Sequence, residues 1–518
     1  MSKKFFLFLF LNFFVIFLSY LFFTFPETNI FSFLNNVSIK PTDTTTKLTI
    51  QNLDNNQVKP LLNQGGSLFQ KTIGGTGYDS GLSIQQTLDK GYIITGETAS
   101  FGAGSFDIFV VKLDSSGNLL WAKTIGGPEK DESYSIQQTS DGGYIIVGDT
   151  ESFGAGYYDI FVVKLDSSGN LLWAKTIGGQ KDDSGYSIQQ TLDKGYIITG
   201  YTESFGAGFS DIFVVKLDSS GNLLWAKTIG GKGYDYGNSI QQTLDRGYII
   251  TGETSNSGSK YFLDIFVVKL DSSGNLLWAK TIGEISYDDY SNSVYETLDG
   301  GYIIAGHTFG FGAGNFDVFI IKLDASGSFS WAKTIGGPEK DESYSIQQTL
   351  DGGYIIVGET ESFGVGESDI FVVKLDSSGN LLWAKTIGGP EKDESYSIQQ
   401  TSDGGYIIVG DTSSIKKRNY DIFVIKLDSS GNVPECNLIT SQNPSVSSQS
   451  PINVSQTPSI SSQNPTVSSP VPIVSFQNPN TQSQCLTTNF TPLFLTPQGN
   501  LAIRTTSNQY KLEKNKDK

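Results

Sequence analysis

Hydrophobic and polar residues alternate in short runs along the middle of the chain, and the runs recur in a fixed order. Within the stretch from Trp121 to Leu172, four runs of five or six residues are separated by Gly, Asp, Ser and Asn. The runs are Trp121–Ile125, Tyr134–Thr139, Tyr144–Gly148 and Ile160–Leu165. They are rich in β-branched and aromatic residues and show no helical period, so the pattern predicts four short strands.

The same order of runs repeats with a nearly constant period. Consecutive tryptophans lie 52 or 53 residues apart, at Trp121, Trp173, Trp225, Trp278, Trp331 and Trp383. One further step toward the amino terminus reaches Phe69, and the pattern stops after Pro434, which makes seven units. A period of this size is typical of a propeller, a solenoid or an array.

The lengths of the connections favour a propeller. Two links in each unit are tight turns, such as Ser140–Gly143 and Asp166–Asn170, which join neighbouring antiparallel strands. The link Gly126–Ser133 is longer, and we interpret it as the crossover to the next sheet. The strand at Phe69 can then complete the last sheet and leave no free edge in the ring. We therefore predict an all-β fold, a seven-bladed β-propeller of four-stranded antiparallel blades with N-terminal strand closure.

Parts of the repeat resemble known propellers. The stretch Ser-x-x-x-Thr-x-Asp-Gly-Gly-Tyr-x-x-x-Gly, followed by Asp-Ile-Phe-Val-Val-Lys-Leu-Asp, looks like the strand pattern of Trp-Asp repeat propellers, although their signature dipeptide is absent. Leu-Asp-Ser-Ser-Gly-Asn-Leu-Leu-Trp resembles the tryptophan-docking motif of quinoprotein-type propellers, with one residue fewer between Asp and Gly. The region as a whole most resembles bacterial and archaeal cell-surface β-propeller repeat proteins. This resemblance implies the fold and assigns no activity.

The charge of the chain argues against a nucleic-acid partner. The 518 residues carry a formal net charge of −17 at neutral pH. Binding to a phosphate backbone depends on clustered Lys and Arg, and an acidic surface mainly supports solubility. We expect a monomer that does not bind nucleic acid.

The ends of the chain are expected to lie outside the propeller. After Lys3 and Lys4 comes Phe5–Phe25, an uncharged stretch that would be roughly 31 Å long as a helix and could cross a bilayer core. We favour an uncleaved signal anchor over a cleaved signal peptide within residues 1–25, with a buried helix as a third alternative. In either of the first two cases the propeller is exported, either anchored at the membrane on the cell surface or secreted after cleavage. Residues 26–67 are interpreted as a linker, 68–434 as the propeller and 486–518 as a C-terminal tail.

A low-complexity tract occupies residues 435–485 and is rich in Ser, Pro and Gln. Its prolines recur every seven residues, at Pro444, Pro451, Pro458, Pro465, Pro472 and Pro479. Such a composition cannot bury a core and favours extended chain, so we expect a spacer or stalk. Cys436 and Cys485 bracket the tract, and in an exported protein they could pair, which would tie it into a loop instead.

Few residues of the seven units suit catalysis. His307 is the only histidine of the chain, at a position where other units carry Glu, Asp or Tyr, and we interpret it as drift at a solvated loop position. No cysteine lies within the units, which excludes thiol chemistry there. We therefore predict no catalytic residue, no metal site and no cofactor, with Ca²⁺ left open because it prefers oxygen ligands.

Carboxylates are abundant, and four Asp positions recur in every unit. The sets that contain Asp141 and Asp166 fall in tight turns and are expected to hold those turns. The two other sets, that of Asp131 and that of Asp159, flank the longer loops. The set of Asp131 consists of Asp79, Asp131, Asp183, Asp235, Asp289, Asp341 and Asp393. Five units add Phe-Gly-Ala/Val-Gly at Phe101, Phe153, Phe205, Phe311 and Phe363. These aspartates and phenylalanines are the candidate ligand-binding residues.

Three interpretations of the loop residues remain open. The aspartates could cap loop backbones while the phenylalanines fill grooves between blades. They could instead bind a repetitive extracellular glycan, a surface polymer or a protein. A pair of carboxylates could also serve as the acid and base of a secreted carbohydrate-active enzyme, but near-identical units supply equivalent environments and not two separated pKa values. We predict a non-catalytic binding scaffold, with this enzyme and a passive surface spacer as alternatives.

Overall fold

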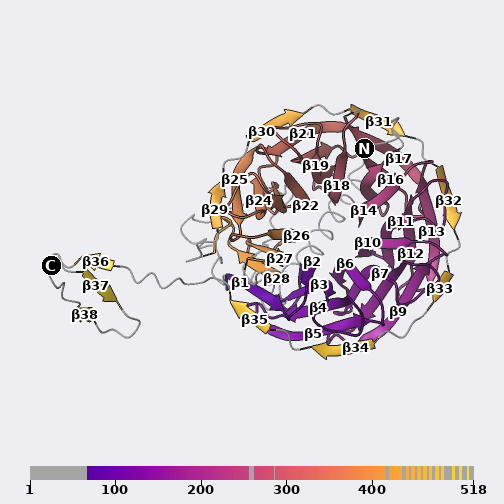
Figure 1. Ribbon diagram of the computed structural model, residues 1–518. Coiled ribbons are helices and arrows are strands. Elements are labelled where there is room, and N and C mark those ends of the chain that lie inside the picture. Colours follow the sequence, from indigo (N-terminus) through magenta and orange to yellow (C-terminus); the bar gives the residue numbers. More distant parts are fainter. Residues whose placement is uncertain are drawn as a thin grey trace, which may run out of the picture. The chain divides into compact units, whose positions relative to one another are not determined.

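The protein forms a ring of β-sheets. The structure is a computed structural model that describes residues 67–255, 262–284, 286–414 and 419–433, together with short strands between residues 439 and 512. Within these residues, seven antiparallel sheets follow one another around an axis (Figure 1). Each sheet contains the four expected strands, so the predicted all-β, seven-bladed propeller is confirmed.

Each blade is built in the predicted order from the axis outward. The innermost strands are β2 (Asp79–Gln86), β6 (Asp131–Gln138), β10 (Asp183–Gln190), β14 (Asp235–Gln242), β18 (Asp289–Glu296), β22 (Asp341–Gln348) and β26 (Asp393–Gln400). The second strands are β3 (Tyr92–Thr98), β7 (Tyr144–Thr150), β11 (Tyr196–Thr202), β15 (Tyr248–Thr254), β19 (Tyr302–Thr308), β23 (Tyr354–Thr360) and β27 (Tyr406–Thr412). The third strands are β4 (Asp107–Leu113), β8 (Asp159–Leu165), β12 (Asp211–Leu217), β16 (Asp264–Leu270), β20 (Asp317–Leu323), β24 (Asp369–Leu375) and β28 (Asp421–Leu427). The fourth strand comes from the following unit, and these strands are β5 (Leu119–Gly126), β9 (Leu171–Gly178), β13 (Leu223–Gly230), β17 (Leu276–Gly283), β21 (Phe329–Gly336), β25 (Leu381–Ile387) and, for the last blade, β1 (Phe69–Gly74).

The ring is closed by the first strand of the propeller. Strand β1 pairs antiparallel with β28, and its register runs from Phe69 opposite Lys426 to Ile73 opposite Ile422. The last blade thus contains residues from both ends of the repeat region. The predicted N-terminal strand closure is confirmed.

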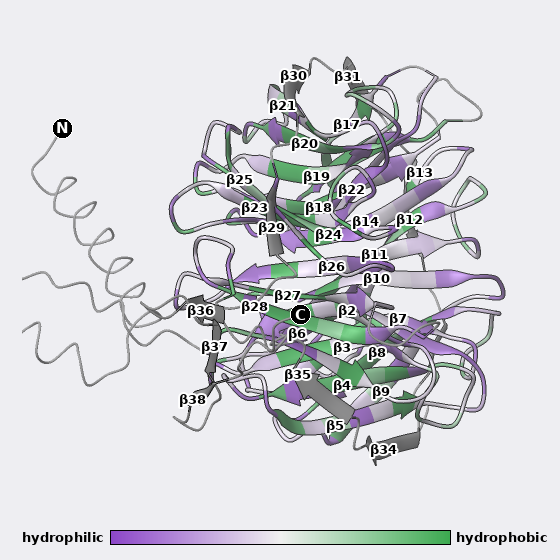
Figure 2. Ribbon diagram, turned by 60° about the vertical axis from the view of Figure 1, so that its left-hand side comes forward, coloured by the Kyte–Doolittle hydropathy of each residue, from purple (hydrophilic) through white to green (hydrophobic). Residues whose placement is uncertain are grey.

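Hydrophobic clusters between neighbouring blades hold the ring together. Figure 2 shows hydrophobic residues along the strands of the ring. In one cluster, Ile108 and Ile125 of the first blade pack with Phe161 of the second, and all three are fully buried. Complete burial of such a side chain is worth about 1.5–3 kcal/mol. Because each cluster takes residues from two blades, no blade has a complete core of its own.

The repeated tryptophan docks against the next blade. Trp121 on β5 lies against Gly169, where a Cβ atom would meet the indole ring at 3.0 Å. Its ring also contacts Tyr144 edge-on, with centroids 6.0 Å apart. Phe69 makes the corresponding contacts with Gly117 and Tyr92 from β1. In the last blade, Phe69 of the closing strand therefore makes the docking contact that a tryptophan makes in the other blades.

The heptad tract differs from the expected spacer, because its strands add a fifth strand to every blade. These strands are β29 (Ile439–Gln442), β30 (Ser445–Gln449), β31 (Ile452–Gln456), β32 (Ser459–Gln463), β33 (Thr466–Ser468), β34 (Ile473–Gln477) and β35 (Asn480–Ser483). They pair with β25, β21, β17, β13, β9, β5 and β1 respectively. The tract runs once around the ring, as Figure 1 shows in yellow and orange. Outer edge strands present unpaired N–H and C=O groups, which an extended segment can satisfy.

Several predictions concern residues at the ends of the chain. The final strands β36 (Leu493–Leu495), β37 (Leu501–Arg504) and β38 (Tyr510–Leu512) form a small sheet. The apolar stretch Phe5–Phe25 and the candidate disulfide partners Cys436 and Cys485 lie outside the described residues. Among the residues that are described, no helix has the length and apolar character needed to cross a membrane.

Candidate functional site

The blades present two different faces at the ends of their strands. The loop face carries the long connections, such as residues 127–130 and 151–158. The turn face carries the tight turns, such as residues 139–143 and 166–170. The candidate ligand-binding aspartates and phenylalanines belong to the loop face.

The aspartates that begin the innermost strands are buried. Asp131 Oδ2 accepts hydrogen bonds from Gly127 N at 2.7 Å and Ser152 Oγ at 2.7 Å, and Oδ1 accepts one from Thr150 Oγ1. Burial raises the pKa of Asp131, and these hydrogen bonds oppose the rise. A backbone N–H of the preceding loop is also bound by Asp79, Asp183, Asp235, Asp289, Asp341 and Asp393. This geometry supports the loop-capping interpretation, and ligand binding by these residues stays a prediction.

The Phe-Gly-Ala/Val-Gly loops fold around a second buried aspartate. Asp159 Oδ2 accepts hydrogen bonds from Ala155 N and Gly156 N, both at 2.8 Å. Gly154 has φ +111°, and a Cβ atom there would overlap the Asp159 carboxylate. The first glycine of the motif is therefore required both by its left-handed backbone and by the space that the aspartate occupies.

The phenylalanines of these loops lie against the core. Phe153 tilts onto Phe161 with ring centroids 5.7 Å apart and packs on the cluster between the first two blades. The same contact, at 5.6 or 5.7 Å, is made by Phe101, Phe205, Phe311 and Phe363. This arrangement matches the groove-filling interpretation and leaves little of each ring available as a platform for a ligand.

A set of buried carboxylates on the second strands was missed by the sequence analysis. Asp149 accepts hydrogen bonds from Gly185 N at 3.0 Å and Ser184 Oγ at 2.9 Å, both in the next blade. Asp411 makes the same bridge to Gly81 N and Ser80 Oγ across the closure of the ring. Burial raises the pKa of Asp149 to about 7 and that of Asp411 to about 8. These groups join blades, and the available signal was their position as the next-to-last residue of a buried strand.

Two pairs of glutamates lie near the loop-face ends of the strands, and within each pair the pKa of one carboxyl is raised while that of the other is lowered. Burial and a hydrogen bond to Glu132 raise the pKa of Glu97. Burial also opposes ionisation of Glu132, but the hydrogen bond from Glu97 and the nearby Lys130 outweigh it and lower the pKa of Glu132. In a second pair, Lys340 Nζ lies 3.1 Å from Glu342 Oε1 and 2.7 Å from Glu359 Oε1. Glu97 and Glu132 thus share a proton, whereas Glu342 and Glu359 share the ammonium group of Lys340.

His307 is buried, so its interpretation as a solvated loop residue was wrong. Its ring lies 4.8 Å from Tyr290 and 5.2 Å from Phe316, between centroids. Its Nε2 is 3.8 Å from Glu342 Oε1. Burial and the positive charge of Lys340 lower the pKa of His307 to about 3, so the ring is neutral at physiological pH. It packs against Tyr290 and Phe316 of its own unit and lies near Glu342 of the next blade.

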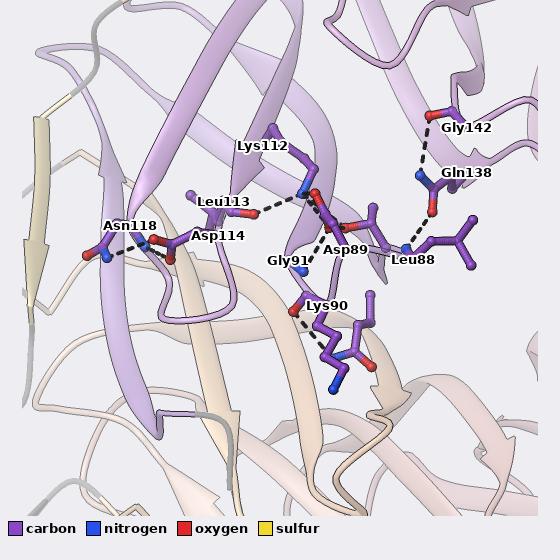
Figure 3. Close-up of polar contacts among 12 residues, drawn as sticks. Leu88, Asp89, Lys90, Gly91, Lys112, Leu113, Asp114, Asn118, Gln138 and Gly142 are labelled. Carbon is purple, nitrogen blue, oxygen red and sulfur yellow. Dashed lines mark hydrogen bonds and ion pairs between the residues drawn. The ribbon is translucent and has the colours of Figure 1, made fainter. Parts of the chain in front are cut away.

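The turn face carries a buried lysine beneath each turn of the inner ring. Lys112 Nζ donates to Leu113 O at 3.0 Å and lies 3.0 Å from Asp89 Oδ2 (Figure 3). Asp89 also accepts Gly91 N at 2.9 Å, which closes the turn. Equivalent pairs join Lys164, Lys216, Lys269, Lys322, Lys374 and Lys426 to the aspartates of their own turns. The prediction that the Asp141 set stabilises these turns agrees with this geometry.

Exposed leucines project from five of these turns. They are 83%, 74%, 82%, 82% and 78% exposed at Leu88, Leu192, Leu244, Leu298 and Leu350. The backbone is held from the next blade, because Gln138 Oε1 accepts the Leu88 N–H at 2.8 Å while Gln138 Nε2 donates to Gly142 O (Figure 3). Ser140 and Ser402 occupy the two remaining turns with the same bridge. The signal available in the sequence was an apolar residue inside a polar turn.

Within the part of the chain that the structure describes, no group of three or more His, Cys, Asp or Glu side chains is arranged to hold a metal ion. Ca²⁺ binding stays a prediction.

Comparison with known proteins supports the fold and leaves the function open. No protein-family model matches the chain. It is 21% identical over 74% of its length to an uncharacterized WD repeat-containing protein of Acanthamoeba polyphaga mimivirus, and 26% identical over 24% of its length to the regulatory protein FlaEY of Caulobacter vibrioides. The chain spans only 38% and 15% of these two relatives.

Similar solved structures are distant and functionally mixed. A protein of unknown function from Dyadobacter fermentans has 12% identity and a TM-score of 0.39, covering 70% of this chain and 99% of the other. An α-L-arabinofuranosidase from Fusarium graminearum has 10% identity and a TM-score of 0.37, with coverage of 70% and 98%. These similarities do not distinguish a binding protein from an enzyme.

Proposed function

We propose that this protein is a non-catalytic, exported binding scaffold that holds a protein partner on its turn face. The proposal is supported chiefly by the five exposed leucines, whose backbone is fixed by hydrogen bonds from neighbouring blades. Apolar side chains displayed on a rigid surface lose little conformational freedom on binding and are typical of interaction sites. The export rests on the apolar stretch Phe5–Phe25.

The turn face suits such a role better than the loop face does. On the loop face, the candidate aspartates and phenylalanines already make internal contacts, as at Asp131 and Phe153. On the turn face, by contrast, the buried lysines are paired with the turn aspartates, and the leucines contribute exposed apolar surface. A partner that covers several turns would gain from each of them in parallel.

The chain itself supplies the substitution that tests this proposal. Serine already occupies the leucine position at Ser140 and Ser402, so Leu→Ser at the other five turns is compatible with the fold. The partner is first purified on the full-length protein, and its affinity is then measured for variants with one, three and five changes. We expect affinity to fall in steps, by roughly tenfold for each leucine that the partner covers. Unchanged affinity in the variant with all five Leu→Ser changes would refute binding at the turn face.

The enzymatic alternative is favoured by one observation, the unequal pKa values of Glu97 and Glu132. Their mutual hydrogen bond argues against it, because glycosidase carboxyl groups stand about 5–9.5 Å apart around the scissile bond. A hydrolysis assay on a panel of polysaccharides, with the full-length protein and Glu132→Gln, separates the two functions. We expect no turnover from either protein. Turnover that disappears in Glu132→Gln would make the protein an enzyme, and a passive spacer would show neither turnover nor partner binding.

A further inference from the structure

The innermost strands enclose a pocket on the axis of the ring, next to the turn face. It has a volume of about 250 Å³ and is lined by two consecutive residues of six innermost strands, such as Ile136 and Gln137, and by three residues of β18. The pocket has room for several waters or for a small ligand. All seven blades contribute to its wall.

The carbonyl oxygens of the glutamines in this wall are already used. Gln137 Oε1 accepts the backbone N–H of Gln190 in the next blade at 2.5 Å. The same bond, at 2.5 to 2.7 Å, is made by Gln85, Gln189, Gln241, Gln347 and Gln399. A backbone N–H can only donate, so the side-chain atom that faces it must be oxygen. This fixes the orientation of all six amides.

The amide NH₂ groups are consequently left for the pocket. Within the described residues, no hydrogen bond is made by the Nε2 of Gln85, Gln137, Gln189, Gln241 or Gln399, and none of these atoms is among the buried unpaired ones. In the remaining blade Tyr295 replaces glutamine, and its hydroxyl is hydrogen-bonded to Gln347. The pocket thus combines mainly isoleucine walls with a ring of amide NH₂ donors.

We propose that this axial pocket binds a small oxyanion, a carboxylate or a tetrahedral sulfate- or phosphate-type group. A ring of donors fits a ligand that offers lone pairs in several directions, and low-polarity walls strengthen such hydrogen bonds. Lys90, Lys194 and Arg246 stand on three of the turns that follow the innermost strands, so this face of the ring also carries positive charge. The turn aspartates do not cancel this charge, because each is paired with a buried lysine such as Lys112.

The test is calorimetric titration of the full-length protein with sulfate, phosphate and acetate in an otherwise anion-poor buffer. We expect saturable binding of at least one of them at one site per chain. Tighter binding of sulfate or phosphate would indicate a tetrahedral ligand, whereas tighter binding of acetate would indicate the carboxylate of a larger molecule. Absence of saturable binding for all three would overturn the proposal.

Matched variants connect binding to the amide ring. Gln137→Glu keeps the acceptor for Gln190 N but replaces the donor with a negative oxygen, and we expect affinity to fall at least tenfold. Glu296 occupies the position equivalent to Gln138, where its Oε2 accepts Leu244 N at 2.8 Å, so a carboxylate is compatible with that neighbouring position. Gln138→Glu adds the same charge one residue outside the pocket wall, so it should retain most of the affinity. Tyr295→Gln completes the ring and should tighten binding. Equal affinities of wild type and Gln137→Glu, or equal losses in Gln137→Glu and Gln138→Glu, would contradict the site.

Discussion

At the scale of single residues, aspartates of similar sequence surroundings take opposite electrostatic roles. Part of Asp141 is buried, which opposes ionisation, but hydrogen bonds from Thr139, Gly143 and Lys164 outweigh this and lower its pKa. Asp149, eight residues later, is fully buried, and its pKa rises to about 7. The turn role of Asp141 could be predicted because the tight turn is visible in the sequence. The role of Asp149 could not, because its partners Ser184 and Gly185 belong to another blade.

The raised pKa values predict a pH dependence of stability. A carboxyl whose pKa is higher in the folded than in the unfolded protein binds more protons when folded, so stability falls as pH rises from about 4 to about 8. We expect Asp149→Asn to be more stable than wild type at pH 8 in urea unfolding, with the advantage gone at about pH 4. The lowered pKa of Asp141 acts in the opposite sense, since its contribution is lost only as pH falls below about 4. An Asp149→Asn effect that is the same at both pH values would contradict this explanation.

Two glycines with positive φ are predicted to respond differently to substitution. Gly154 (φ +111°) faces the Asp159 carboxylate, whereas Gly142 (φ +83°) has nothing within 4 Å of a Cβ position. The equivalent of Gly142 is Lys90, with φ 65°, so a side chain is tolerated there. We expect Gly142→Lys to change the unfolding free energy by less than about 1 kcal/mol and Gly154→Ala to lower it by about 2–4 kcal/mol. Equal effects in urea unfolding would contradict the role given to the loop aspartate.

At the scale of elements, the strands of the repeat could be predicted and the strands of the tract could not. The predicted run Trp121–Ile125 lies within β5, which extends it by two residues at the start and one at the end. The tract lacks a hydrophobic pattern, and its partners are up to several hundred residues away, as when β35 pairs with β1. Its seven-residue period nevertheless matches one strand per blade, because the five strands β30 to β34 each lie between two consecutive heptad prolines.

Removal of the tract should therefore expose the outer edges without dissolving the ring. We compare the full chain with a chain that ends at Val433 by hydrogen–deuterium exchange. Peptides that cover β5 and β17 should exchange at least tenfold faster in the shorter chain, because the hydrogen bonds to β34 and β31 are lost. Peptides that cover the inner strands β6 and β14 serve as the control and should be unchanged. Equal exchange of β5 in both chains would mean that the tract does not pair with the blades.

At the scale of the whole molecule, closure by β1 makes the first and last units dependent on each other. Phe69 packs on Tyr92 and Gly117, and the cluster around it includes Ile422 and Val424 of the last blade. The number of units was predictable from the repeat period, and the closure from the connection lengths. The axial pocket was not, because it arises only where equivalent residues of all seven blades meet.

The closure predicts a large effect of one substitution. We expect Phe69→Ala to lower the unfolding free energy by about 3–5 kcal/mol, since a large core side chain is removed at the seam of the ring. Urea unfolding followed by tryptophan fluorescence measures this loss. Leu88→Ser, at an exposed turn, is the control and should stay within about 0.5 kcal/mol of wild type. A loss below about 1 kcal/mol for Phe69→Ala would show that the ring does not depend on its first strand.

The central functional claim is that a partner is held on the turn face and not on the loop face. The most direct measurement is amine cross-linking of the purified partner to the full-length protein, followed by mass spectrometry of the linked peptides. We expect links at Lys90 and Lys194, which stand beside exposed leucines on the turns. Links confined to Lys130 and Lys181, in loops at the opposite ends of the strands, would contradict it.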